Sequence, residues 1–168
     1  ESEYLERQKK VFRQHYAIAE EFGLPLVLHV RDAHDDMIEL LKEIKQEKGS
    51  LIRGVVHCYT GNWTHAEHYL ELGFNLGFTG VVTFPPKKTN PEPQLQLEEV
   101  LRRIPLDRIL VETDAPFLAP QAYRGEQCEP WMVEEVVKKI AHLREISIED
   151  MEHLLYRNTL DLFTKIVR

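Results

Sequence analysis

The stretch Ile109-Leu-Val-Glu-Thr-Asp-Ala-Pro-Phe-Leu-Ala-Pro120 gives the clearest indication of the fold of this chain. Its first three residues form a short apolar run, which is typical of a buried strand. Two carboxylates, Glu112 and Asp114, follow, and Pro116 ends the strand because proline cannot donate to a central ladder. Carboxylates at the carboxyl end of a parallel strand lie where α/β proteins build their sites. A solvated loop after a core strand would show the same residues, so the rest of the chain has to separate the two interpretations.

Three further apolar runs precede this stretch, and segments with helical spacing of apolar residues separate all four. The runs cover residues 26–30, 52–57 and 74–80, and the helical segments cover 5–22, 37–44, 64–73, 97–104, 130–140, 147–155 and 160–166. Strict alternation of strands and helices predicts a parallel sheet covered by helices. Four such units fit either a small open sheet or half of an eight-stranded barrel, because a whole barrel takes about 250 residues.

The composition is that of an ordinary globular protein. The chain has 168 residues, 43% of them apolar and 29% charged, so we expect residues 1–168 to form a single domain. The net charge of -7 argues against a broadly basic nucleic-acid binder, but it leaves room for a nuclease whose metal ions supply positive charge locally.

Cysteine content and hydropathy indicate the compartment. Two cysteines are too few for a disulfide framework, and no apolar run approaches the ~20 residues of a membrane span, so we expect a reducing, cytoplasmic location and no membrane contact. The chain begins inside a helix-like segment without a methionine, which suggests that the N-terminus of a longer protein is absent.

Three of the predicted strands end in potential metal ligands: His29, His57 and Asp114. Adjacent parallel strands lie about 4.8 Å apart, so two neighbouring imidazoles can share one ion with bonds of about 2.0–2.1 Å. Asp114 would lie about 10 Å from His57 in a flat sheet, so a joint site favours a closed barrel. A single histidine after an apolar run is more often structural than ligating, but three matched positions favour a metal site.

Five further residues are candidates with a structural alternative each. Glu112 could orient a metal-bound water or a ligand, or form an ion pair. Arg31 could bind phosphate through its planar guanidinium, or pair with a neighbouring acid. Tyr59 follows His57 at the same edge, and Arg124 and Glu129 belong to the loop above it, where a helix-capping role for Glu129 is the alternative.

The combination of motifs resembles the TatD family of metal-dependent DNases, which are amidohydrolase-like barrels. The matching segments are Leu28-His-Val-Arg-Asp-Ala33, Val56-His-Cys-Tyr-Thr-Gly61, Gly80, Ile104-Pro-Leu-Asp-Arg-Ile-Leu-Val-Glu-Thr-Asp-Ala-Pro-Phe-Leu118, Arg124-Gly125, Glu129-Pro130, Asn158 and Leu162-Phe163. By this resemblance the chain is the second half, about four β/α units, of a TIM-like (β/α)8 barrel. The N-terminal half, which carries a His-x-His pair and a glutamate in the family, would be absent from this chain.

The resemblance also implies a chemistry. His29, His57 and Asp114 would ligate two divalent metal ions, and nitrogen and oxygen ligands without thiolate suit Mg, Mn or Zn. Asp114 would also accept a proton from the attacking water, with Glu112 as its helper. The implied reaction is phosphodiester hydrolysis in DNA, acting from the 3′ ends of single strands.

Two alternatives stay open at this point. One is another metal-dependent hydrolase of the same superfamily, acting on an amide or on an ester such as a mischarged aminoacyl-tRNA. The other is an inactive fragment, or one half of a barrel completed by an absent N-terminal half or another chain, because half a barrel exposes two sheet edges. In that case we expect weak or no activity from the isolated chain.

Overall fold

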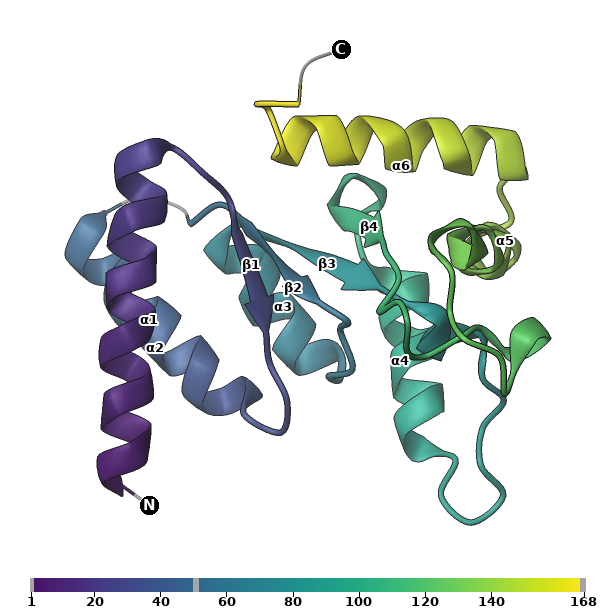
Figure 1. Cartoon of the computed structure of the whole chain (residues 1–168), viewed down its shortest axis with the longest axis horizontal. Helices are drawn as coiled ribbons and strands as arrows, with labels where there is room; N and C mark the ends of the chain where they lie inside the picture. Colours follow the sequence, from purple (N-terminus) through teal and green to yellow (C-terminus); the bar gives the residue numbers. More distant parts are fainter. Residues whose placement is uncertain (1, 50–51, 167–168) are drawn as a thin grey trace.

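The computed structural model describes residues 2–49 and 52–166, whose backbone alternates helices with parallel strands (Figure 1). The strands are β1 (Leu26–His29), β2 (Gly54–His57), β3 (Phe74–Phe78) and β4 (Ile109–Val111). They form one sheet in the order β1-β2-β3-β4, and each neighbouring pair is parallel. The α-helices are α1 (Ser2–Phe22), α2 (His34–Lys48), α3 (Trp63–Leu72), α4 (Glu92–Arg103), α5 (Val133–Arg144) and α6 (Ile148–Leu162).

Local sequence signals account for several helix boundaries. Helix α2 ends at Gly49, which adopts a left-handed φ of 70° that glycine accepts without steric cost. Helix α6 begins after Ser147, whose hydroxyl accepts a 3.1 Å hydrogen bond from the Asp150 N–H. Helix α6 then continues to Leu162, so the separate last helix predicted over residues 160–166 is wrong: residues 160–162 belong to α6.

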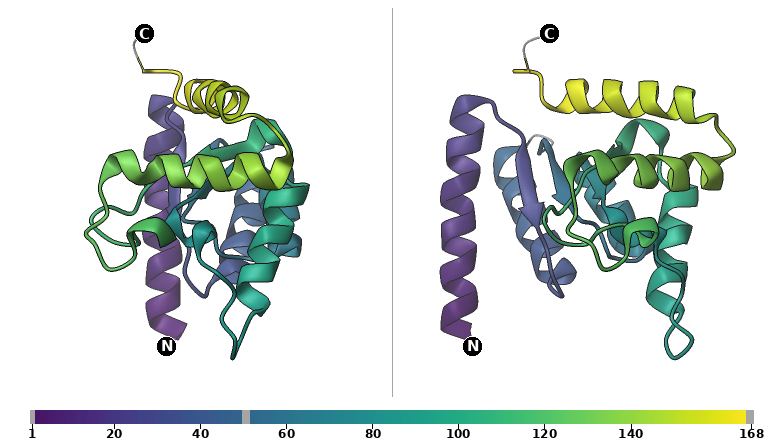
Figure 2. Two further views of the ribbon diagram at one scale, coloured as in Figure 1. Left: turned by 90° about the vertical axis from the view of Figure 1, so that its right-hand side faces the viewer. Right: turned by 45° about the vertical axis from the view of Figure 1, so that its right-hand side comes forward.

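One face of the sheet packs against the helices and makes the main core. The strand residues on this face are large and apolar, and they join buried residues from α2, α3, α4 and α5 in one cluster; the strand members are Leu28, Val56, Phe74, Leu76, Phe78 and Ile109. Their period of two along each strand directs them all to the same side. In Figure 1 and in the right view of Figure 2, α1 stands at one side of the molecule, and α4, α5 and α6 lie at the other.

The opposite face of the sheet is divided along the strands. Near the strand starts, Val55 and Leu110 pack against Leu162 at the end of α6, in a small separate cluster. Near the strand ends, this face carries His29, His57 and Gly77 from β1, β2 and β3, and the chain leaves β4 through Glu112. The polar half of this face therefore lies at the carboxyl ends of the strands.

The expectation that the fold is half of a closed barrel is wrong. The four described strands form an open parallel sheet, and β1 and β4 do not pair with each other. The expectation of a barrel rests on the family resemblance and on the distance of about 10 Å that a flat sheet predicts between Asp114 and His57. The two side chains are in contact at 3.2 Å within the open sheet, so their meeting does not require closure.

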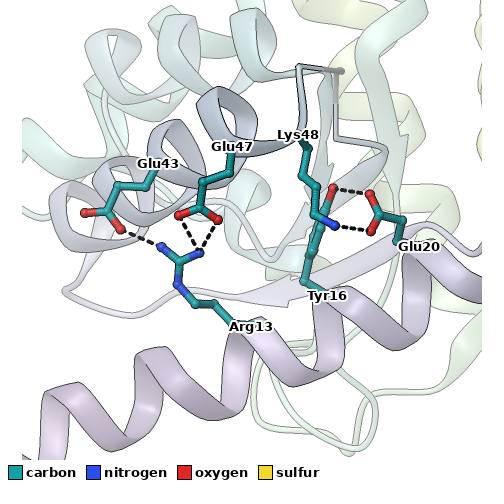
Figure 3. A network of polar contacts seen from close by, with 6 residues as sticks. All are labelled: Arg13, Tyr16, Glu20, Glu43, Glu47 and Lys48. Carbon is teal, nitrogen blue, oxygen red and sulfur yellow. Dashed lines mark hydrogen bonds and ion pairs between the residues drawn. The ribbon is translucent and has the colours of Figure 1, made fainter.

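Helix α1 is attached to α2 by a polar network at the surface (Figure 3). The guanidinium of Arg13 donates to Glu43 and Glu47 at 2.8 Å, and Lys48 donates to Glu20 at 2.7 Å. Tyr16 is buried and belongs to this network, because its hydroxyl donates to Glu20 at 3.3 Å, so packing and polar contacts act together here. Within residues 2–49 and 52–166, no helix is long and apolar enough to cross a membrane.

Candidate functional site

His57, at the end of β2, lies between two carboxylates that come from the end of β4. Its Nδ1 is 2.8 Å from Oε1 of Glu112, and its Nε2 is 3.2 Å from Oδ1 of Asp114. The side chains of His57 and Glu112 are 20% and 22% exposed, whereas that of Asp114 is 39% exposed. The Glu112 contact therefore lies deeper, and the Asp114 contact faces the solvent side.

Gly77 explains how Glu112, which directly follows β4, reaches a residue of β2 across β3. A Cβ placed on Gly77 would lie 2.5 Å from Oε1 of Glu112, so only glycine leaves room for this carboxylate above β3. The same oxygen accepts a 2.6 Å hydrogen bond from the backbone N–H of Cys58. Glu112 is thus fixed by a backbone donor and holds the Nδ1 side of His57.

The two carboxylates determine the protonation of His57. Burial lowers the pKa of His57, but the hydrogen bonds and negative charges of Glu112 and Asp114 outweigh it and raise the pKa above its ordinary value. A raised pKa means that this position attracts positive charge, which is a property that a cation site needs.

The separation of His57 Nε2 and Asp114 Oδ1 suits two ligands of one divalent ion. Ligand bonds of about 2.0–2.2 Å, at angles between about 90° and 109°, place two ligand atoms about 2.8–3.6 Å apart, and the observed separation is 3.2 Å. Glu112 on Nδ1 would leave Nε2 as the coordinating atom, which is the carboxylate–histidine–metal arrangement of many metal sites. The donor atoms present therefore fit a divalent metal.

His29 lies one strand away from this pair. It is in register with His57 on the neighbouring strand, and the two ring centroids are 6.2 Å apart. His29 is exposed, so its ring can turn at little cost. Among residues 2–49 and 52–166, no three His, Cys, Asp or Glu side chains are already grouped closely enough to hold a metal ion. The structure therefore brings two of the three predicted ligands together and places the third beside them.

Arg31 and Tyr59 occupy very different environments. The side chain of Arg31 is 85% exposed and only approaches Asp32 at 4.0 Å, so its guanidinium is available at the edge of the site. Tyr59 is 2% exposed, and its hydroxyl donates to the backbone oxygen of Asn62 at 2.5 Å. Because the ring is buried and the hydroxyl is already hydrogen-bonded, Tyr59 offers no free surface to a ligand. Its position does not support a substrate-binding role.

Arg124 and Glu129 lie on the segment that follows the site carboxylates. The guanidinium of Arg124 is 4.3 Å from the ring centroid of Phe84, in a cation–π arrangement. Glu129 is exposed and immediately precedes the short 3-10 turn Pro130–Met132, where its N–H donates to the sulfur of Met132 at 3.5 Å. The position of Glu129 thus matches the helix-capping role, which was the structural alternative to substrate binding.

Backbone strain is concentrated after the site strands. Asp32, Cys58 and Leu118 have positive φ values of 52°, 47° and 55°, and each follows one of the three predicted ligands within four residues. Non-glycine residues adopt this region at a cost, and such residues cluster at functional sites because the surroundings enforce them.

Sequence reasoning missed two contributors to the site. They are Gly77, which lies inside the predicted strand run 74–80, and the backbone N–H of Cys58. A glycine inside a strand often marks the close approach of another group, so Gly77 did carry a usable signal. The Cys58 N–H carried none, because its role depends on a carboxylate that lies 54 residues further along the chain.

The fold and the site define a parallel α/β protein with a candidate metal site at the carboxyl ends of its strands. A family model described as TatD related DNase matches residues 1–164. The chain belongs to this family.

Curated relatives carry names of the same kind. The metal-dependent hydrolase YabD of Bacillus subtilis is 40% identical over 156 residues, which are 93% of this chain and 57% of YabD. The 3'-5' ssDNA/RNA exonuclease TatD of Pectobacterium parmentieri is 38% identical over 143 residues, which are 83% of this chain and 52% of that protein. The chain thus spans little more than half the length of these relatives.

Solved structures agree with this fold. The crystal structure of YjjV, a TatD homologue from Escherichia coli, superposes with a TM-score of 0.81 at 28% identity and covers 96% of this chain and 58% of that one. A TatD family hydrolase from Entamoeba histolytica gives 0.74 at 21% identity, with 92% of this chain and 56% of that one, and supports the fold alone.

The family match takes in residues 1–164, and the YjjV structure covers 96% of the chain. The relatives' names support a divalent metal for this family, without its identity or number.

Proposed function

We propose that this protein is a metal-dependent phosphodiesterase that cleaves single-stranded nucleic acid. The observation that carries the proposal is His57 held between Glu112 and Asp114 at the carboxyl edge of the sheet. Family membership supports the hydrolase class, and the name of the Pectobacterium relative supports a single-stranded substrate cut from its 3′ end. DNA is the substrate that the family description favours.

His57, Asp114 and His29 would hold the metal, and we propose two divalent ions, Mg, Mn or Zn. When bound, divalent cations polarise a phosphoryl oxygen and lower the pKa of water. Glu112 would keep the Nδ1 proton of His57 in place, so that Nε2 stays directed toward Asp114. Asp114, the more exposed of the two carboxylates, would accept a proton from the attacking water.

Arg31 is the group of this chain best placed to contact phosphate. Its exposed guanidinium follows His29 by two residues and offers the planar pair of donors that phosphate oxygens accept. Its contribution would be to orient the substrate, because it has no contact with His57 or Asp114 among the described hydrogen bonds and ion pairs.

The test uses the purified protein and single-stranded DNA labelled at its 5′ end. We expect a ladder of shortened products in the presence of Mn²⁺ or Mg²⁺, and none after addition of EDTA. The Arg31→Ala variant should raise the KM with a smaller effect on kcat. Intact DNA under all metal conditions would overturn the proposal, and hydrolysis of an aminoacyl ester instead would favour the esterase alternative.

A further inference from the structure

Two aromatic side chains are exposed on the segment that follows Asp114. Phe117 is 69% exposed, and Trp131 is 52% exposed. Large aromatic residues bury much apolar surface when they can, so exposed rings beside a site indicate a binding function more often than isolated exposed residues elsewhere do.

Backbone hydrogen bonds tie the segment that carries both residues to Asp114. The N–H of Phe117 donates to the carbonyl of Asp114 at 2.8 Å, which closes a turn directly after the candidate ligand. The N–H of Cys128 donates to the carbonyl of Pro116 at 3.0 Å. This second bond ties the start of the segment to its end, and Trp131 follows three residues later.

The segment has a packed core of its own, and Trp131 packs against a neighbouring ring. Ala119, Cys128 and Met132 form a small buried cluster, against which Tyr123 packs. The ring of Tyr123 packs edge-on against Trp131, with centroids 5.1 Å apart and planes at 83°. Since this support fixes Trp131 before any ligand arrives, binding to its free surface would cost little conformational entropy.

Charge limits what this surface can bind by electrostatics. The chain has a net charge of -7, and Glu126 and Glu129 on the same segment are exposed. Arg124 is the one arginine of this segment, and its guanidinium already lies over Phe84. A broad attraction to phosphates is therefore not available here, and stacking on aromatic rings is the contact that remains.

We propose that Phe117 and Trp131 stack on unpaired bases of the single strand whose phosphodiester lies at His57 and Asp114. The proposal rests on the proposed function for its substrate class. Every base presents a planar face to an aromatic ring, so such stacking tolerates any sequence. A duplex hides these faces, so the same rings would favour single strands over double strands.

The test measures binding in EDTA, so that it does not depend on hydrolysis. The probes are a short oligothymidylate and an abasic oligonucleotide of the same length, and the signal is the fluorescence of Trp131 in a Trp63→Phe background. Trp63, the other tryptophan, lies 4.2 Å from the guanidinium of Arg103 and would otherwise add its own emission. We expect the oligothymidylate to quench Trp131 and the abasic probe to leave it unchanged.

Single substitutions distinguish base stacking from the mere presence of a large apolar side chain. Binding measured by anisotropy of a labelled oligothymidylate should weaken about tenfold in Phe117→Leu and in Trp131→Leu, and much less in Trp131→Phe, which keeps a ring. Tyr156→Ala is the matched control, because Tyr156 is 63% exposed on α6. Circular dichroism checks that each variant is folded.

The outcomes distinguish this inference from the proposed function. Equal binding of the abasic probe, or unchanged binding in both leucine variants, would overturn base stacking even if the protein hydrolyses DNA. Base-dependent binding in a protein that shows no metal-dependent hydrolysis would support stacking and reject the proposed function.

Discussion

The carboxylate of Glu112 occupies the space where any residue other than glycine at position 77 would place its Cβ. That Cβ would come within 2.5 Å of Oε1 and 2.8 Å of Cδ of Glu112. The finding links three strands: the residue after β4 supplies the carboxylate, β3 supplies the gap, and β2 supplies His57, which the carboxylate contacts at 2.8 Å.

Gly77→Ala should therefore damage the site more than the fold. The clash falls on the end of a flexible side chain, so Glu112 can move aside, and alanine is also the better strand residue. We expect the free energy of unfolding to change by less than about 1 kcal/mol and the affinity for Mn²⁺ to fall by about 10-fold or more. Denaturant unfolding and a metal titration measure the two effects, and an unchanged titration would contradict this role of Gly77.

Gly80→Ala is the matched comparison. A Cβ on Gly80 would lie 2.4 Å from the carbonyl oxygen of Leu118 and 2.9 Å from the nitrogen of Pro120, which are backbone atoms that cannot turn away. We expect this variant to lose about 1–3 kcal/mol of stability because the backbone must shift. Urea unfolding of the two variants compares their losses of stability. The expected contrast is contradicted if Gly80→Ala is as stable as the wild type.

Glu112→Gln should weaken metal binding while the protein stays folded. Glutamine keeps the size of the side chain but removes the negative charge that helps to raise the pKa of His57. Loss of such a supporting carboxylate typically costs about 10- to 100-fold in metal affinity. Isothermal titration with Mn²⁺ measures this loss of affinity. Wild-type affinity in the variant would mean that Glu112 is a structural partner of Cys58 alone.

Asn158 should contribute to stability through the contact of α6 with the sheet. Its Nδ2 donates to the carbonyls of Leu106 at 2.7 Å and Ile109 at 2.9 Å, and the side chain is buried. Asn158→Leu leaves both carbonyls without this donor, which costs about 1–3 kcal/mol. Thermal unfolding should give a clearly lower melting temperature for Asn158→Leu than for Arg157→Ala, an exposed neighbour on the same helix. Equal melting temperatures would refute this role of Asn158.

His34 should make stability depend on pH in the acidic range. Burial, together with the neighbouring His65 ring at 4.9 Å, lowers the pKa of His34 below its ordinary value of about 6.5. The unfolded chain then takes up a proton before the folded chain does, so stability falls as the pH falls below about 6.5. His34→Phe should flatten this fall between about pH 6.5 and 5.

The control for this prediction is His15→Gln, at an exposed position on α1. The melting temperature of each protein, measured across the acidic range, gives the slope. The account of His34 is contradicted if the wild type and His34→Phe lose stability equally on acidification.

Much of the sheet could be predicted because each strand is a separate apolar run. The predicted runs 26–30, 52–57, 74–80 and 109–111 contain β1, β2, β3 and β4. The open form could not be predicted in the same way, because the local pattern of a strand does not say whether the sheet closes. The argument for closure failed because Asp114 contacts His57 at 3.2 Å in the open sheet.

The candidate site was predicted in its residues but not in its contacts. His57 and Asp114 follow strand ends, which a pattern of apolar runs can locate, and the structure places them 3.2 Å apart. The division of roles between Glu112 and Asp114 depends on which nitrogen of His57 each one meets, and no spacing in the chain contains that information. The stacking of His34 on His65 likewise joins two helices that only the tertiary fold brings together.

The most direct test of the account is a titration of the protein with Mn²⁺, compared between the wild type and Asp114→Asn. Asparagine keeps the shape of the side chain but removes the charge that faces His57 Nε2 at 3.2 Å. The account predicts saturable binding by the wild type and at least a tenfold loss in the variant, with unchanged far-ultraviolet circular dichroism. Equal affinity in the two proteins would contradict the assignment of the metal to His57 and Asp114.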